Sequence, residues 1–365
     1  MSENGPTEKK KVHFAFVDLV RGILAVYVVV CHWCLFSNFD LFPSAYLAVD
    51  YFFMMSGFVI AFAYQSKLRN GYKKSVFLYQ RVLRLYPFIL AGATVGFAYA
   101  AVKSFAAHGF IDFETWRLFA MNVLMIPESL FLTDFAYPLN IPMWFLFFIA
   151  VSYVAFAFFL YRAPTWAISL FAALMAALLS TWFMGFFGSK LMIPNELIYE
   201  LSNFWRCGFS ICIGILIFRI YGFVERVRFP KVAIIILAAL PMLIMATPRG
   251  LMPWWGYQAL FVGTFPLAFA CGLKVELKGK FAKVAKTAGD FSLPLYIAHM
   301  PVLFFAESAL YALGIEDRTI HLWLGWIVVP STCLIVFIGY RMITHFFRKA
   351  TNLAAPVIFK SPSRG

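Results

Sequence analysis

Long apolar runs alternate with short, mostly basic loops along almost the whole chain. A helix needs about 20 predominantly apolar residues to cross the hydrocarbon core of a bilayer. Such runs predict transmembrane helices, because a helix satisfies its backbone hydrogen bonds within one segment. The pattern therefore predicts an all-α polytopic membrane protein. It places ten spans, at residues 14–36, 46–64, 86–103, 141–161, 164–186, 201–221, 232–248, 255–273, 290–313 and 321–346.

The stretch 116–133 is the main ambiguity in this pattern. It is apolar, but Asn122, Pro127 and Glu128 interrupt it. We interpret it as an interfacial or re-entrant helix in preference to an eleventh span. An eleventh span would also move the Lys-rich loop 274–286 to the side of the membrane that has few basic residues, against the usual charge asymmetry.

Composition strengthens the membrane interpretation. Hydrophobic residues make up 62% of the chain and charged residues 13%, whereas ordinary globular domains have about 45–50% and about 25%. These values exclude a soluble, disordered or fibrous protein. The net charge is +14, but the basic residues lie in short loops, which indicates membrane topology and contact with anionic lipid instead of a nucleic-acid partner.

The basic residues also predict the orientation, because Lys and Arg concentrate on the cytoplasmic side of a membrane. With the N-terminus in the cytoplasm, 25 Lys and Arg fall on the cytoplasmic side and 6 on the other. We therefore expect both termini to be cytoplasmic. The expected organisation is a cytoplasmic tail at 1–13, one transmembrane domain at 14–346 and a cytoplasmic tail at 347–365.

The first two spans hold three ionisable residues of particular interest, Arg21, His32 and Asp50, and an ionisable residue inside a span costs roughly 2.5–3.5 kcal/mol to insert. Arg21 and His32 are eleven residues apart, which is about 16.5 Å and close to three full turns of one helix, so both point to nearly the same face. Asp50 is expected at the depth of His32. A His–carboxylate pair supports the imidazole as a general base; the alternative is a structural hydrogen bond between helices.

Arg81 and Arg84 precede the third span at helical i and i+3 spacing. Two guanidinium groups on one face can hold phosphate by bidentate hydrogen bonds, and the alternative is ordinary lipid contact. Cationic groups at one depth and a base roughly 16 Å away suit a long donor with phosphates at one end. Acyl-coenzyme A has that shape, with its thioester at the far end of the pantetheine arm.

These residues also carry a family resemblance. The chain resembles the acyltransferase-3 family of integral membrane acyltransferases over residues 14–346. The matching pieces are Arg21 with His32, VDYFFMMSGF at 49–58, Arg81 with Arg84, FWRCGFSICIG at 204–214 and GDFSLPLYIAHMP at 289–301. The resemblance implies transfer of an acyl group, often acetyl, from cytoplasmic acyl-CoA to a hydroxyl of a cell-surface polysaccharide, a glycolipid sugar or a small molecule. It also implies an integral protein of the bacterial inner membrane.

With this resemblance, we expect His32, oriented by Asp50, to act as the catalytic base. Arg21, Arg81 and Arg84 are expected to hold the donor phosphates. Further contacts to donor or acceptor are expected from Ser56, Tyr296 and Trp144, among which the sequence does not choose.

His299 lies in the middle of the ninth span, where a role in the donor channel and a structural hydrogen bond have equal weight. Arg206 either meets a glycan acceptor or pairs with Glu200. Many family members read Trp-Ser-Leu-x-x-Glu at the fourth span, whereas residues 144–149 read WFLFFI, so Ile149 stands where the glutamate would be. Glu196, Glu200 and Asp134 are the candidates to replace it.

The sequence contains no cluster with metal-ligand spacing, so we expect no metal cofactor. The main alternative function is a secondary transporter of a sugar or lipid-linked glycan, in which the intramembrane Arg, His and Asp form a proton or substrate path. Transporters often consist of two inverted halves, and no such internal symmetry is evident.

Overall fold

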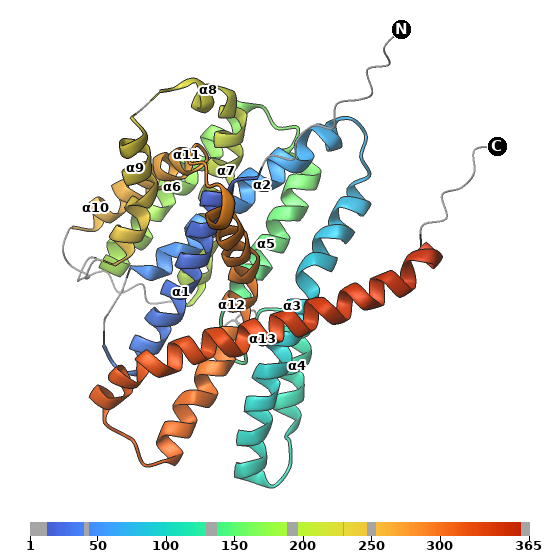
Figure 1. Ribbon diagram of the computed structural model, residues 1–365, viewed down its shortest axis with the longest axis vertical. Helices are drawn as coiled ribbons and strands as arrows, with labels where there is room; N and C mark the ends of the chain where they lie inside the picture. The colour runs from blue at the N-terminus through green and yellow to red at the C-terminus, as the bar shows by residue number, and fades with distance from the viewer. Residues whose placement is uncertain are drawn as a thin grey trace.

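The computed structural model describes residues 13–39, 44–128, 137–187, 196–228, 230–246 and 253–358 (Figure 1). This part of the chain is helical throughout and contains no strand, as the hydrophobic pattern predicts. The α-helices are α1 (Ala15–Phe36), α2 (Ala48–Arg69), α3 (Lys74–His108), α4 (Phe113–Leu124), α5 (Met143–Ala155), α6 (Thr165–Phe187), α7 (Glu196–Arg219), α8 (Tyr221–Arg226), α9 (Lys231–Met245), α10 (Trp254–Ala259), α11 (Phe265–Gly272), α12 (Gly279–Ala312) and α13 (Arg318–Ile358). Short 3-10 or π-helical turns are η1 (Ala45–Leu47), η3 (Phe156–Leu160) and η4 (Leu260–Thr264).

Seven helices of the described ranges are long and apolar enough to cross a membrane, and they coincide with seven of the ten predicted spans. The other three predictions fall on α6, on α9 and on the α10–α11 region. Helix α9 has 15 residues, or about 22 Å, which is shorter than the bilayer core of about 30 Å. The π-helical turn η4 separates α10 from α11. The count of ten spans therefore stays a prediction.

The ambiguous stretch contains α4, which has 12 residues and a length of about 18 Å, too short to cross a bilayer. Asp112 caps α4 by accepting a 2.7 Å hydrogen bond from the backbone N–H of Thr115. This bond holds the pKa of Asp112 below its usual value. The end of the stretch lies in residues 129–136, outside the described part of the chain.

Helices α2 and α7 pack with their backbones in contact. A Cβ atom at Gly214 would collide with the carbonyl oxygen of Met54 and lie 2.7 Å from the backbone nitrogen of Phe58. A Cβ atom at Gly57 would likewise collide with the carbonyl oxygen of Ile211. Small residues allow membrane helices to approach this closely, so the two glycines fix the spacing of α2 and α7.

Gly214→Ala is expected to lower the thermal unfolding temperature of the purified protein in detergent. Either the two helices separate or the alanine is overpacked, and overpacking costs about 1–3 kcal/mol. Gly339→Ala is the matched control, because a Cβ at that position on α13 meets nothing within 4 Å. Equal unfolding temperatures for the two variants would contradict the close contact.

Helix α12 contains two prolines, Pro294 and Pro301. Proline cannot donate to the carbonyl four residues earlier, so Pro301 leaves the carbonyl of Ile297 without its helical partner. That carbonyl instead accepts a 2.9 Å hydrogen bond from the side-chain amide of Asn140, which precedes α5. The bond joins α12 to the start of α5 and fixes the turn of α12 that carries Tyr296 and His299.

Helix α13 crosses α12 and runs past α3 in Figure 1. It continues to Ile358, so the first part of the expected tail at 347–365 extends the last helix. Phe337 of α13 packs edge-on against Phe291 of α12, with 5.4 Å between ring centroids. This contact places Tyr340 beside the cavity described below.

Candidate active site

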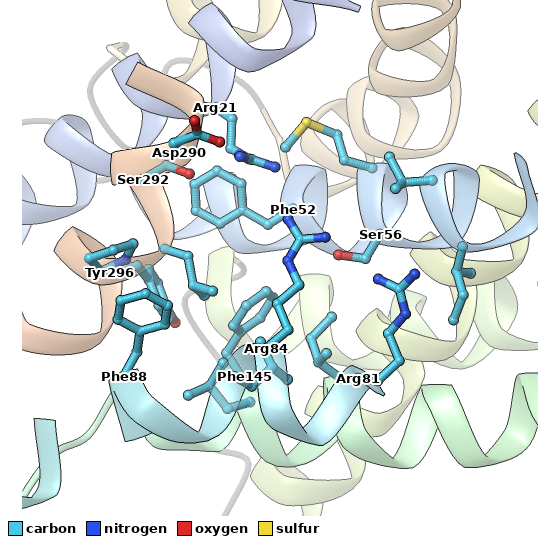
Figure 2. A pocket seen from close by; sticks show the side chains of 18 of the residues that line it. Arg21, Phe52, Ser56, Arg81, Arg84, Phe88, Phe145, Asp290, Ser292 and Tyr296 are labelled. Atoms are coloured by element: carbon cyan, nitrogen blue, oxygen red, sulfur yellow. The ribbon is translucent and has the colours of Figure 1, made fainter. Parts of the chain in front are cut away.

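A cavity of about 260 Å³ lies among α1, α2, α3, α5, α12 and α13 (Figure 2). Five of the residues predicted from sequence to contact the donor line it: Arg21, Ser56, Arg81, Arg84 and Tyr296. They come from the first three helices, α1, α2 and α3, and from α12, which lies far along the chain from them. The fold thus brings these five to one place, whereas His299, for which a donor-channel role was also considered, does not line this cavity.

Three guanidinium groups make this cavity strongly cationic. The side chains of Arg21, Arg81 and Arg84 extend into the same space in Figure 2. Arg21 has a carboxylate nearby, since Oδ1 of Asp18 lies 3.5 Å from its guanidinium. Asp290 is the acidic residue among the described lining of the cavity, and it pairs with Lys286 at 3.1 Å.

Arg81 is buried, with 7% of its surface exposed, and it has no carboxylate partner in the described ranges. Its guanidinium lies 4.3 Å from the ring centroid of Tyr64, a cation–π contact. Its Nε has no hydrogen-bond partner. Burying an unpaired charge is costly, so this position favours an anionic ligand.

Arg21 is held in place by the packing of α1 against α12. It donates a hydrogen bond to the carbonyl oxygen of Gly289. The close approach of the two helices depends on Gly22, where a Cβ would lie 2.6 Å from Ala288 Cβ. Since α1 is continuous from Ala15 to Phe36, Arg21 and His32 lie about 16.5 Å apart along one helix axis, as predicted.

The partner of His32 is a second histidine. His32 Nδ1 lies 2.9 Å from the carbonyl oxygen of Val28 and 3.1 Å from Nε2 of His299. On the other side, His299 Nδ1 lies 2.8 Å from the carbonyl of Tyr296 and 3.1 Å from that of Leu295.

These contacts assign the tautomers of both rings. The carbonyl oxygens require a donor, so His299 carries its proton on Nδ1 and presents the lone pair of Nε2 to His32. His32 then carries its proton on Nδ1, shared between Val28 and His299. Its Nε2 keeps a lone pair and can accept a proton.

Asp50 does not pair with His32, so the predicted His–carboxylate pair is wrong. The Asp50 carboxylate instead accepts hydrogen bonds from Arg206, at 2.7 Å from Nη2 and 3.0 Å from Nε. Both side chains are buried, at 0% and 4% exposure. A carboxylate inside a membrane protein is stabilised most by a full positive charge with matching geometry, and α7 supplies one directly opposite Asp50.

Arg206 also donates to the carbonyl of Tyr46 at 3.1 Å and approaches Asn203 Oδ1 at 3.4 Å. Its guanidinium lies 5.5 Å from the ring centroid of Trp144. These contacts make Arg206 part of the helix packing. Glu200, the other predicted partner, has a side chain outside the described part of the structure.

Aromatic side chains of α2, α5 and α12 form a cluster in the lining of the cavity. The ring centroids of Phe145 and Tyr296 are 5.0 Å apart, and those of Phe52 and Tyr296 are 5.9 Å apart. The Tyr296 ring is in turn 5.9 Å from the His299 ring. Neither histidine of the pair lines the cavity, but Tyr296 does line it and its ring contacts that of His299.

Ile149 lines the cavity and is buried, so an apolar side chain stands at the position where the family resemblance implies a glutamate. Of the candidate replacements, Asp134 lies outside the described residues, as do the side chains of Glu196 and Glu200. The part of the chain that the structure describes contains no group of three His, Cys, Asp or Glu that could hold a metal ion.

Sequence reasoning missed three features of this site: the His32–His299 contact, the stacking of Arg81 on Tyr64 and the aromatic cluster. One signal was available for the first. Tyr296 and His299 are three residues apart, hence on one face of α12, and both are polar side chains in the middle of an apolar span.

The fold and the site define an all-helical membrane protein with a cationic cavity and, further along α1, a partly exposed histidine in contact with the buried His299. The chain belongs to the acyltransferase-3 family: the family model, described as an acyltransferase domain, matches residues 14–341. This match favours the acyltransferase interpretation of the sequence over the transporter alternative.

One curated relative is "Protein 2 in picA locus" of Rhizobium radiobacter, which is 41% identical over 87 residues. The match covers 24% of this chain and 45% of that protein. The chain thus spans less than half the length of the relative. No solved structure matches the chain.

Proposed function

We propose that this protein is an O-acyltransferase that moves an acyl group, acetyl in the simplest case, from acyl-CoA to a hydroxyl group. The acceptor is a membrane-associated or extracytoplasmic molecule, such as a sugar of a cell-surface polysaccharide or glycolipid. The proposal rests above all on the arrangement of two residues of α1. Arg21 lines the arginine-rich cavity, and His32, whose Nε2 keeps a lone pair, lies about three helical turns further along the same helix.

In this proposal the donor phosphates bind Arg21, Arg81 and Arg84. Guanidinium groups hold phosphate by charge-assisted hydrogen bonds, and the unpaired, buried Arg81 supports this role. The pantetheine arm then follows the cavity past Ser56 toward Tyr296. This direction brings the thioester to the side of the membrane where His32 lies.

His32 is the proposed general base. Its Nε2 takes the proton of the acceptor hydroxyl while the hydroxyl oxygen attacks the thioester carbonyl carbon. The carbon–sulfur bond then breaks, and the thiolate of CoA recovers the proton from His32. No acyl-enzyme is required. Trp144, which is partly exposed beside Arg206, is a candidate contact for the acceptor.

His299 is a proposed positioning residue in this mechanism. Its neutral Nε2 accepts a hydrogen bond from Nδ1–H of His32, which keeps the His32 proton on Nδ1 and leaves the lone pair of Nε2 available as the base. In hydrolases with a catalytic triad, a carboxylate has the corresponding place. Here Asp50 forms an ion pair with Arg206, and in the proposed mechanism the His299 imidazole orients the base in place of a carboxylate.

The proposed location is the inner membrane of a bacterium, with both termini in the cytoplasm. The asymmetry of 25 against 6 basic residues supports this orientation. It places the arginine-lined part of the cavity on the cytoplasmic side, where acyl-CoA is made, and the histidine pair nearer the opposite face.

Arg81→Gln is expected to weaken equilibrium binding of radiolabelled acetyl-CoA to the purified full-length protein by ten- to a hundredfold. The reason is the loss of a charge-assisted contact, which contributes about 1.5–3 kcal/mol. Lys67→Gln is the matched control, since Lys67 contacts the same Tyr64 ring at 5.1 Å but does not line the cavity. Equal weakening by both variants, or no binding by the wild type, would contradict the proposed donor site.

A further inference from the structure

A second cavity, of about 440 Å³, opens where α2 and α7 end and α6 begins. Three arginines line it: Arg69, Arg162 and Arg219. No acidic residue is among its lining. It has no part in the proposed acyl transfer, because none of its described lining residues is shared with the cavity lined by Arg21, Arg81 and Arg84.

Two of these guanidinium groups are held rigidly by neighbouring backbone. Arg69 Nε donates to the carbonyl of Tyr161 at 3.0 Å. Arg219 donates to the carbonyl of Leu160 at 3.2 Å and to the hydroxyl of Thr165 at 3.2 Å. Fixing like charges around one space without a carboxylate is unfavourable unless an anion binds between them.

Unpartnered polar atoms mark this cavity as a binding site. Gln65 lines it and is 7% exposed, and its buried side-chain oxygen has no hydrogen-bond partner among the described residues. Nε of Arg219 is also buried without a partner. Buried polar atoms in folded proteins normally make hydrogen bonds. A ligand that accepts a hydrogen bond from Nε of Arg219 and donates one to the side-chain oxygen of Gln65 would supply both missing partners.

The start of α6 adds to the attraction for an anion. Thr165, the first residue of this 23-residue helix, lines the cavity, and the N-terminal end of a helix carries positive partial charge. Exposed apolar side chains follow on the same helix: Trp166 and Leu170 are 70% and 65% exposed. They lie one turn apart, as a surface covered by lipid chains requires.

We propose that this second cavity binds a phosphate group that carries a neighbouring hydroxyl. The guanidinium groups accept the phosphate charge, and Gln65 accepts a hydrogen bond from the hydroxyl. An anionic phospholipid with a glycerol headgroup and a free phosphate ester share this chemistry. The exposed apolar face of α6 beside the cavity favours the lipid. This site does not depend on the proposed acyl transfer.

Arg162 offers the clearest test. Its guanidinium lies 5.2 Å from the centroid of the Tyr161 ring, and unlike Arg69 and Arg219 it donates no hydrogen bond to a backbone carbonyl of the described residues, so replacing it disturbs the fold least. The purified full-length protein in detergent would be titrated with phosphatidylglycerol, and binding would be followed by native mass spectrometry and by the unfolding temperature. We expect Arg162→Gln to weaken phosphatidylglycerol binding about tenfold. Gln65→Leu, which keeps the buried volume, is expected to weaken it as well.

The control is Arg226→Gln, an exposed arginine of α8 that does not line the cavity; it should leave binding unchanged. The same titrations would be carried out with phosphatidylcholine, inorganic phosphate and glycerol 3-phosphate. Protection by glycerol 3-phosphate that Arg162→Gln abolishes would support the site and assign it to a soluble ester. Equal stabilisation by phosphatidylcholine, or equal loss in all three variants, would overturn the proposal.

Discussion

Replacing His32 by alanine is expected to lower kcat for acyl transfer by about a hundred- to ten-thousandfold, the contribution of a positioned general base. The affinity for acyl-CoA should stay within a few-fold of the wild type, because the arginines that bind it lie about 16.5 Å away along α1. His32 does not line the donor cavity, which supports this separation of binding from chemistry.

The measurement uses the native host, where the acceptor is present. Ester-linked acetyl groups on envelope and secreted glycans would be compared by mass spectrometry between strains that carry wild type and His32→Ala, after confirming equal amounts of protein in the membrane. His108→Ala is the control, an exposed histidine at the end of α3. Normal acetylation by a folded His32→Ala protein would exclude His32 as the base.

His299 gives the same mechanism a second, independent readout. His299→Phe removes the acceptor for the Nδ1 proton of His32, so kcat should fall while KM for acyl-CoA changes little. His299→Gln is expected to restore part of kcat, because its amide oxygen can accept a hydrogen bond from Nδ1–H of His32. A purely structural role for His299 would instead lower protein yield and unfolding temperature without rescue by glutamine.

Much of the donor side follows from sequence because it depends on single helices. The spacing of Arg21 and His32 sets their common face, and that of Arg81 and Arg84 sets theirs, whatever the helices pack against. The ten-span pattern succeeded for long uninterrupted helices. It was less informative for α9 and for the α10–α11 region, since hydropathy does not register a shortened helix or a π-helical turn.

The partner of His32 could not be derived in the same way, because it depends on which helices meet. The prediction assumed that α1 and α2 face each other at the depth of His32. In the structure the long contact of α1 is with α12, through Gly22 and Gly289, and this contact brings His299 to His32.

The helix toward which the Asp50 side chain points could have been predicted from the sequence. Met54 and Gly57 follow it at i+4 and i+7, so the three residues share one face of α2. Gly57 is the residue that admits α7. A carboxylate on the same face as such a glycine points at the neighbouring helix, where Arg206 lies.

The Asp50–Arg206 pair leads to the last prediction, a large loss of stability. Asp50→Ala should lower the free energy of unfolding by about 3–5 kcal/mol, because the guanidinium of Arg206 is then left buried without its counter-charge. Arg206→Ala should do the same to Asp50. The double variant Asp50→Leu/Arg206→Met should be more stable than either single variant, since replacing both members with apolar groups leaves no unpaired charge.

Unfolding of the purified proteins in mixed micelles would measure these differences. The kcat of the folded fraction would then separate the two roles considered for Asp50. If the carboxylate only joins α2 to α7, folded Asp50→Asn enzyme keeps kcat within about tenfold of wild type, far above the level of His32→Ala. A stable Asp50→Asn protein with kcat as low as that of His32→Ala would show that the carboxylate serves His32 after all.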